Sequence, residues 1–387
     1  MKMSKMKWID RWGGLFLCTL LTPLGYLLPR GKAVNLPRKI LVIKFWGMGS
    51  TIMVGYLLRA LKKEYPFSEL TYLTLESNRE IASMLGYADK IESLNLSKGF
   101  VGIFFNIINM LISVFSNKYD VVIDLEYLTR FTALVTLATW APVRVGFYAR
   151  GFWRGNFHNR KAPFNPYWHT RDNFLNLAKA ARLNVKSESF YRLIPPDHAR
   201  EKVDILLKEN GINGEYIIIN PNAGATSLER RWHPEKFASL INKIAEELTI
   251  PCILIGNKDE IDICNLIAEK NKNNKVVNFA GKTDVAMLSA LLEKAKVVVT
   301  NDSGPLHLAT HVGAKVVGLY GPETPVLWGP ITKNKADATI FFLNLDCSPC
   351  INIHNMKTVN CLKNKAECLG GISVEDVFRA VKKLVES

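Results

Sequence analysis

The sequence predicts an α/β protein that contains two Rossmann-like, doubly wound domains. Its 387 residues are too many for one ordinary core, and 48% of them are hydrophobic, which is ample for two cores. Short apolar runs typical of buried parallel strands alternate with helical stretches, and this alternation indicates a parallel sheet covered on both faces. It occurs once before and once after a connector at about 187–215.

The composition divides the chain into four segments. A basic and apolar segment, 1–35, precedes the first Rossmann-like domain at 36–190 and the second at 191–345. A cysteine-containing segment with a final helix follows at 346–387.

Each domain has its own series of expected elements. In the first, we expect strands at 39–44, 69–75, 120–125 and 144–147, a turn at 45–49 and a helix at 50–63. In the second, we expect strands at 216–220, 252–255, 276–279, 297–300 and 316–320, and helices at 234–248, 259–269, 284–294 and 305–312. The aromatic, Arg- and Gly-rich stretch 148–168 has no period, so we expect a long functional loop on the acceptor side.

The first segment is unlike the rest of the chain. Its basic residues Lys2, Lys5, Lys7 and Arg11 precede an apolar stretch at 15–28. Thr22, Pro23 and Gly25 interrupt that stretch, which is shorter than the roughly 20 residues of a spanning helix, and no cleavage motif follows. A basic, aromatic-bearing segment that lies in a membrane interface, with Trp8 and Trp12 at headgroup depth, is favoured over an ordinary helix packed on the domain.

The formal net charge of +15 favours an acidic partner. A phosphorylated substrate, an anionic membrane surface and nucleic acid all fit such a charge, as does a soluble Lys-rich surface. The basic residues are spread along the chain and form no recognised nucleic-acid motif, so no nucleic-acid partner is expected.

The strongest motif is the strand, loop and helix at 297–307. Ligands of open α/β sheets bind at the carboxyl ends of strands, and a helix N-terminus binds phosphate through its amides and dipole. The amides of Ser303 and Gly304 would face such a ligand. Asp302 would repel a diphosphate, so it is expected either to accept hydrogen bonds from sugar hydroxyls or to cap the helix with Ser303.

Two further loops point to the same kind of ligand. The loop at 220–235 offers the hydroxyls of Thr226 and Ser227, and Arg231 offers a planar fork suited to phosphate. An ordinary αβ connection with exposed arginines is the alternative. In the loop at 45–50, Gly49 allows a tight turn and Lys44 would face the cleft at the end of its strand.

Together these loops resemble glycosyltransferase family 9, the ADP-heptose:lipopolysaccharide heptosyltransferase family. The resemblance covers roughly 39–330, and 301–307 and 318–322 are its more specific motifs. It implies a GT-B fold with two domains facing a cleft, no metal or other cofactor requirement, the donor on the second domain and the acceptor mainly on the first. It implies donor contacts from Thr226, Ser227, Arg231, Glu260, Thr283, Asp302, Ser303, Gly304 and His307, and acceptor-side roles for Lys44 and Gly49.

One position departs from the family pattern. The family has an Asp, thought to be the general base, where this chain has Ser50, and a serine needs a base of its own to accept a proton. Glu126, at the end of the 120–125 strand, is the preferred substitute, although an acceptor-binding or structural Glu126 is equally open. Asp124 would lie deeper on the same side, and His169 is a weaker candidate.

These features predict an inverting, metal-independent glycosyltransferase that moves a sugar, with heptose from ADP-heptose favoured. The acceptor would be a lipopolysaccharide-type or other cell-surface glycan, and the enzyme would be cytoplasmic and peripheral on the cytoplasmic face of the bacterial inner membrane. The alternative is a catalytically impaired nucleotide-sugar or glycan-binding protein, because Ser50 replaces the expected base.

Four of the seven cysteines cluster near the end of the chain, at Cys347, Cys350, Cys361 and Cys368. Their spacing is compatible with a structural four-thiolate zinc site. Free or redox-labile thiols are the favoured alternative, because the second pair is loosely spaced.

Overall fold

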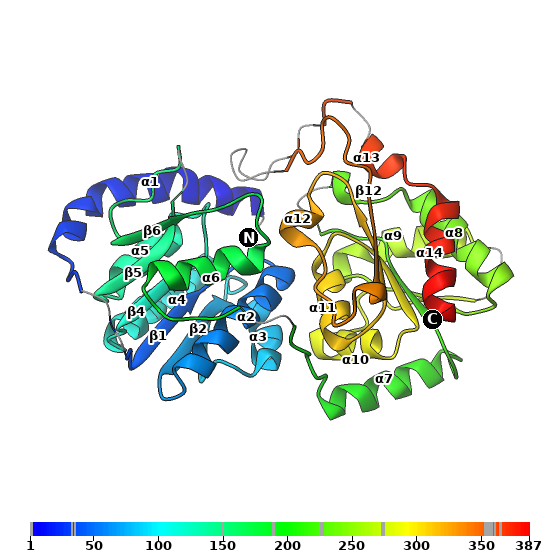
Figure 1. The fold of residues 1–387 in the computed structure, drawn as a ribbon, viewed down its shortest axis with the longest axis horizontal. Helices are drawn as coiled ribbons and strands as arrows, with labels where there is room; N and C mark the ends of the chain where they lie inside the picture. Colours follow the sequence, from blue (N-terminus) through cyan, green and yellow to red (C-terminus); the bar gives the residue numbers. More distant parts are fainter. Residues whose placement is uncertain are drawn as a thin grey trace. The chain divides into compact units, whose positions relative to one another are not determined.

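The computed structural model describes residues 3–31, 34, 36–148, 151–187, 190–224, 228–271, 275–351, 359, 361–363 and 366–387. The chain forms two compact units, Met1–Glu188 and Ser189–Ser387, drawn in blue to green and in green to red in Figure 1. Each unit contains one parallel six-stranded sheet with helices, so the predicted α/β fold of two doubly wound domains is confirmed.

The sheet of the first unit has the order β3-β2-β1-β4-β5-β6, and every pair is parallel. Its strands are β1 (Lys39–Ile43), β2 (Glu69–Leu75), β3 (Lys90–Leu94), β4 (Val121–Asp124), β5 (Val143–Tyr148) and β6 (Arg160–Pro163). Its helices are α1 (Met3–Leu27), α2 (Met48–Glu64), α3 (Arg79–Leu85), α4 (Gly99–Ser116), α5 (Phe131–Ala138) and α6 (Thr170–Ala180), with a 3₁₀ turn η1 (Glu76–Asn78).

The second unit repeats this topology with the order β12-β11-β10-β7-β8-β9, again all parallel. Its strands are β7 (Ile217–Asn220), β8 (Cys252–Leu254), β9 (Val276–Asn278), β10 (Val297–Asn301), β11 (Val316–Tyr320) and β12 (Ala338–Phe342). Its helices are α7 (Asp197–Glu209), α8 (Pro234–Glu247), α9 (Ile261–Glu269), α10 (Val285–Glu293), α11 (Gly304–Val312), α12 (Pro325–Trp328), α13 (Glu367–Gly370) and α14 (Val374–Glu386). Its 3₁₀ turns are η2 (Leu228–Arg230), η3 (Lys258–Glu260) and η4 (Lys335–Asp337).

The central strands are largely apolar because they are buried on both faces of their sheets. Every residue of β4, β7, β10 and β11 is buried. In α14, buried Val377, Phe378, Val381 and Leu384 recur at helical spacing and pack in the core cluster that includes α8. The strand ends that carry the polar loops are therefore held on rigid sheets.

Several elements differ from the sequence-based expectation, and β3, β12, α3, α5 and α6 were not predicted. Helix α1 continues through Pro23 to Leu27 instead of breaking there, because Cys18 and Leu28 pack in a buried cluster with α5. The 148–168 stretch is not wholly irregular, since β6 pairs with β5 from Val145↔Arg160 onward. Helix α4 was not predicted, because its 18 residues contain no charged side chain and so lack the polar face that marks a surface helix.

Candidate functional site

In the second unit, the carboxyl ends of two neighbouring strands are tied together by Asn220. β7 and β10 pair with Asn220 opposite Thr300. The Asn220 amide donates to the Thr300 hydroxyl at 2.9 Å and to the Ser303 hydroxyl at 3.0 Å. The two loops that the sequence singled out therefore begin side by side at one edge of the sheet.

Asp302 is paired with a cation. Arg230 Nη2 lies 2.5 Å from the Asp302 carboxylate and 2.5 Å from its carbonyl oxygen, and Asp302 is only 4% exposed. Burial lowers the pKa of Arg230, but the neighbouring Asp302 carboxylate outweighs this and raises it above its ordinary value. The pair offsets the negative charge that made Asp302 an unexpected neighbour for a diphosphate.

The start of α11 is not capped by a side chain. Ser303 is its N-cap in extended conformation, and neither Ser303 nor Asp302 makes a side-chain cap hydrogen bond. Asn301 instead accepts a hydrogen bond from the Trp232 amide at 2.9 Å, which fixes the loop after β10 to the loop after β7. Gly304 is the first helical residue, so the helix dipole begins at the predicted position.

Arg231 and Glu260 are brought together from two different loops. Arg231 Nη2 donates to the Gly224 carbonyl at 3.0 Å and lies 3.5 Å from Glu260 Oε1. Glu260 is buried in η3 after β8, where its other carboxylate oxygen accepts from the Asn257 amide at 2.9 Å. The predicted donor residues Thr226 and Ser227 lie outside the described residues.

The remaining predicted donor residues lie on two further elements. Thr283 is half-buried in the turn between β9 and α10. His307 is 2% exposed on α11, and its ring faces Trp328 of α12 with 6.1 Å between the ring centroids. The described donor residues thus lie on the segments that follow β7, β8, β9 and β10.

In the first unit, Lys44 and Glu126 meet at the ends of the adjacent strands β1 and β4. Lys44 Nζ lies 2.7 Å from Glu126 Oε1, and the two residues are 4% and 6% exposed. The same Oε1 accepts from the amides of Phe45 and Trp46 at 2.9 and 3.1 Å. Because Oε1 is engaged by three donors, a base role for Glu126 depends on its second carboxylate oxygen.

The loop after β1 places the other predicted residues beside this pair. Gly47 has a φ of 89° and is the N-cap of α2, and Gly49 is buried in the first turn. A Cβ atom at Gly47 would lie 3.3 Å from the Ser50 hydroxyl, so Ser50 lies against this turn. Ser50 is half-buried at the position where the family pattern has the base.

Behind Glu126 lies a buried network that the sequence did not reveal. Asp124 is fully buried, with a hydrogen bond from Thr132 at 3.0 Å, a contact with His158 Nε2 at 3.0 Å and an ion pair with Arg154. Burial raises the pKa of Asp124, but the Arg154 charge and the His158 hydrogen bond outweigh it and hold the pKa below the ordinary value.

Arg154 links this network to the Glu126 loop. It donates to the Glu126 carbonyl at 2.6 Å and to the Thr129 carbonyl at 2.8 Å. A charged residue between the aromatic residues of the 148–168 stretch was the only sequence signal for it. His169, the weaker base candidate, is the N-cap of α6 and accepts from the Arg171 amide at 3.2 Å, which is a structural role.

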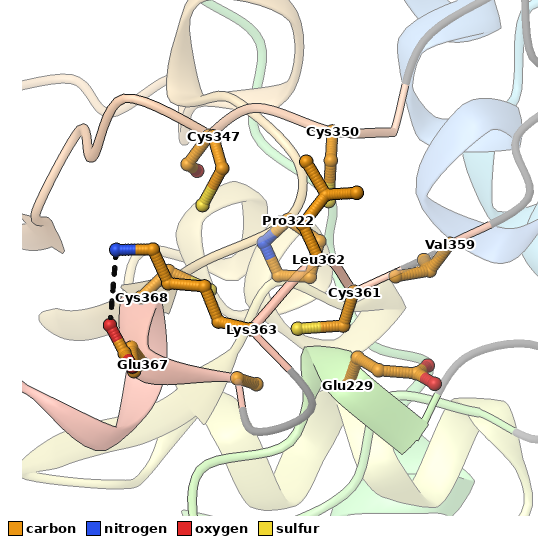
Figure 2. A pocket seen from close by; sticks show the side chains of 12 residues that line it. Glu229, Pro322, Cys347, Cys350, Val359, Cys361, Leu362, Lys363, Glu367 and Cys368 are labelled. Atoms are coloured by element: carbon orange, nitrogen blue, oxygen red, sulfur yellow. Dashed lines mark ion pairs between the residues drawn. The ribbon is translucent and has the colours of Figure 1, made fainter.

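The four terminal cysteines line one pocket of about 150 Å³ (Figure 2). Burial raises the pKa of Cys350, and it raises that of Cys368 to about 11. The pocket adjoins the 318–322 motif, because the Ile351 amide donates to the Pro322 carbonyl at 2.8 Å and a Cβ atom at Gly321 would lie 2.9 Å from Cys368 Sγ. Within the described ranges, no group of three or more His, Cys, Asp or Glu residues is placed to hold a metal ion, and the zinc site stays a prediction.

Known proteins share both the sequence pattern and this fold. The chain is 24% identical over 354 residues to lipopolysaccharide heptosyltransferase 3 of Escherichia coli, which covers 87% of this chain and 95% of that protein. A family 9 glycosyl transferase structure from Veillonella parvula matches 92% of this chain and 99% of its own, with a TM-score of 0.75 and 24% identity. The Escherichia coli ADP-heptose LPS heptosyltransferase II structure matches 90% and 98%, with a TM-score of 0.70 and 21% identity.

These neighbours have the GT-B fold, so the fold class implied by the resemblance is confirmed. The family model for glycosyltransferase family 9 (heptosyltransferase) matches residues 109–359, which is more than half of the chain. This match includes β4 and the Glu126 that follows it, the Arg230–Asp302 pair and the start of α11. The chain therefore belongs to glycosyltransferase family 9, the heptosyltransferase family, and is a glycosyltransferase.

Proposed function

We propose that this enzyme transfers a heptosyl group from ADP-heptose to a lipopolysaccharide-type or other cell-surface glycan acceptor. The observation that carries the proposal is the joined pair of loops in the second unit, in which Arg230 is paired with Asp302 just before α11 and Arg231 is paired with Glu260. A cation and a helix N-terminus at the end of a parallel strand suit a nucleotide diphosphate. The family match and the ADP-heptose enzyme among the structural neighbours support the choice of sugar donor.

The proposed reaction is a single displacement with inversion. The acceptor hydroxyl oxygen forms a bond to the anomeric carbon while the bond from that carbon to the diphosphate oxygen breaks, and ADP leaves with the electron pair. Arg231 and the amides at Ser303 and Gly304 stabilise the charge that develops on the leaving diphosphate, which allows the step to proceed without a metal. The hydroxyl proton passes to a base on the first unit, and Glu126 is the proposed group.

The remaining site residues have supporting roles in this proposal. Glu260 and Thr283 contact the nucleoside, while Thr226, Ser227, Asp302 and His307 contact the phosphates or the sugar. Lys44 and Gly49 shape the acceptor side, because Lys44 holds the Glu126 carboxylate at 2.7 Å against the loop that contains Gly49. Ser50 lies beside that loop and binds the acceptor rather than accepting its proton.

The first test separates donor binding from transfer. We expect Arg231→Ala to weaken ADP binding by on the order of 10–100-fold, because a charge-assisted hydrogen bond to phosphate is lost, while Arg231→Lys keeps part of the affinity. Calorimetric titration with ADP measures this effect. Wild-type affinity in Arg231→Ala would remove Arg231 from the donor site.

The second test concerns the base. Glu126→Gln keeps the shape of the side chain, so we expect ADP binding to stay unchanged and the rate of heptosyl transfer to fall by on the order of 100-fold or more. Transfer at the wild-type rate would exclude Glu126 as the base. Ser50→Asp is the companion variant, since it restores the family residue and should accelerate transfer if the base position is what limits this enzyme.

Ser50 also supports a second candidate function, that of a catalytically impaired nucleotide-sugar or glycan-binding protein. In that case the wild-type protein would bind ADP-heptose without turnover, Glu126→Gln would stay at background, and Ser50→Asp would be the variant that raises transfer above it. Transfer by the wild-type enzyme above background excludes this alternative.

We also propose that the enzyme is cytoplasmic and lies on the cytoplasmic face of the inner membrane. The acceptor is then a lipid-linked glycan, and the basic N-terminal segment contacts the anionic membrane surface. The cysteine pocket holds either a structural zinc ion or free thiols, and metal analysis of the purified protein together with thiol titration distinguishes them.

A further inference from the structure

We infer that the outward faces of α1 and α4 together form a surface that docks on an anionic lipid bilayer. The inference rests on the proposed function only in that the acceptor is lipid-linked. It extends the proposed membrane contact from the N-terminal segment to α4, a helix inside the first Rossmann-like unit.

The two helices flank the same helix, α5, and use different sides of it. Cys18 and Leu28 pack with Ala133 and Leu137 of α5 in one buried cluster. Met110 and Val114 of α4 pack with Val135 in another cluster. Helices α4, α5 and α1 therefore lie in a row in the first unit.

Helix α1 has two faces, and its inner face is packed against the start of α5. The Asp10 carboxylate accepts hydrogen bonds from the amides of Arg130 and Phe131 at 2.8–3.1 Å and so caps the start of α5. Gly14 allows close contact, because a Cβ atom there would lie 2.9 Å from Arg130 Cβ. With Cys18, these residues form an inner stripe at four-residue spacing.

The outer face of α1 is apolar where a soluble helix would be polar. Its stripe consists of Trp8, Trp12, Phe16, Leu20, Leu24 and Leu27, which are 38–72% exposed. Asp10 is the only acidic residue of the helix, and it is turned inward as the α5 cap. Arg11 lies over the Trp12 ring at 5.4 Å, an arrangement in which the cation can reach headgroups above a buried indole.

Helix α4 presents the same chemistry. Its outward side chains include Phe100, Val101, Phe104, Phe105, Ile112 and Phe115, which are 54–84% exposed. Among the described helices, α4 alone is long and apolar enough by composition to cross a membrane. Met110 and Val114 are nevertheless buried at 7% and 0% exposure, and Ser113 donates to Glu92 of β3 at 2.8 Å. Helix α4 is thus fixed on its sheet and would lie in the plane of the interface rather than span the bilayer.

The basic residues near this surface favour an anionic bilayer as its binding partner. Exposed Lys98 and Lys118 flank α4, which itself has no charged residue. At the far end of α1, a cavity of about 490 Å³ is lined by Arg30, Arg144 and Lys161 and by no carboxylate. A symmetric dimer through this surface would bring like cations together, whereas anionic headgroups would neutralise them.

The test is sedimentation with vesicles of phosphatidylglycerol and phosphatidylcholine, compared with pure phosphatidylcholine. Phe100→Ser with Phe104→Ser in α4, and separately Trp8→Ser with Trp12→Ser in α1, should each lower the vesicle partition coefficient at least about tenfold. Phe115→Ser is a second, single α4 variant. Phe67→Ser is the matched control, because Phe67 is 100% exposed in the turn after α2, a helix that packs mainly on α3 and α6, and it should bind as wild type.

Binding by wild type should be stronger to the anionic vesicles and should weaken with salt. Wild-type vesicle binding by both α4 variants would overturn the inference. It would also be overturned if the wild-type protein were a dimer and these variants were monomers that still bind vesicles. Transfer to a deacylated, water-soluble acceptor should be unchanged in the α4 variants. If wild type transfers heptose to no acceptor yet binds vesicles as described, the proposed function fails and the docking surface stands.

Discussion

At the scale of single residues, the structure replaces isolated motif residues with pairs. Asp302 is neutralised by Arg230 at 2.5 Å, and Glu126 is held by Lys44 at 2.7 Å. Each pair joins the ends of two loops, so each affects loop position as well as charge. A substitution in one partner of such a buried pair leaves the other charge uncompensated, which costs more than the contact itself is worth.

This argument predicts the behaviour of Asp302 variants. Asp302→Ala leaves the Arg230 guanidinium without its carboxylate, so we expect the free energy of unfolding to fall by roughly 3–5 kcal/mol. Asp302→Asn keeps a hydrogen-bond acceptor and should cost less. Thermal unfolding without ligand measures both variants, and equal stability of Asp302→Ala and wild type would contradict a structural role for the pair.

The buried His158 predicts a pH dependence of stability. Burial lowers the pKa of His158 below 6.5, so the unfolded chain takes up a proton on this residue before the folded chain does. The free energy of unfolding should therefore decrease as the pH falls below about 6.5, and the Asp124 contribution should be lost only at still lower pH. His158→Gln should flatten the upper part of this curve, as urea unfolding at several pH values would measure.

At the scale of elements, two adjacent glycines of α1 have different surroundings, one closely packed and one open. Gly14 is closely packed against Arg130, while the nearest atom to a Cβ at Gly13 is Ile9 Cγ2 at 3.9 Å. Gly13→Ala should stabilise α1 by about 0.5–1 kcal/mol, because alanine favours the helix. Gly14→Ala should instead destabilise the protein by about 1–3 kcal/mol, because the added methyl group must displace Arg130. Urea unfolding compares the two, and an equal effect would refute this packing.

At the scale of the whole molecule, each unit has its own sheet and its own core. The described donor residues all lie in the second unit. We therefore expect ADP at 100 times its dissociation constant to stabilise the second unit by about 2.7 kcal/mol and to leave the first unchanged. Calorimetry with and without ADP should show one shifted transition, and Arg231→Ala should reduce that shift. A single transition that moves as a whole would contradict independent units.

The sequence by itself determined the alternating α/β pattern, the family and the central strands of both sheets, but not β3, β6 or β12. Apolar strand runs and the motif at 301–307 are local signals, and local periodicity is what a sequence records directly. The base residue could not be determined in this way, because Ser50 breaks the pattern and the surroundings of Glu126 come from residues about 80 positions away.

Only the tertiary structure decided which polar residues form pairs and which apolar faces remain uncovered. Arg230 rather than Arg231 contacts Asp302, and two adjacent arginines are indistinguishable until the loop has a conformation. The helix at 99–116 has no charged residue, and apolar side chains occur all around it, so its sequence does not separate the buried side from the side left exposed. Pairing and exposure depend on contacts between segments that are far apart in the chain. These contacts cannot be read from the residues of one segment alone.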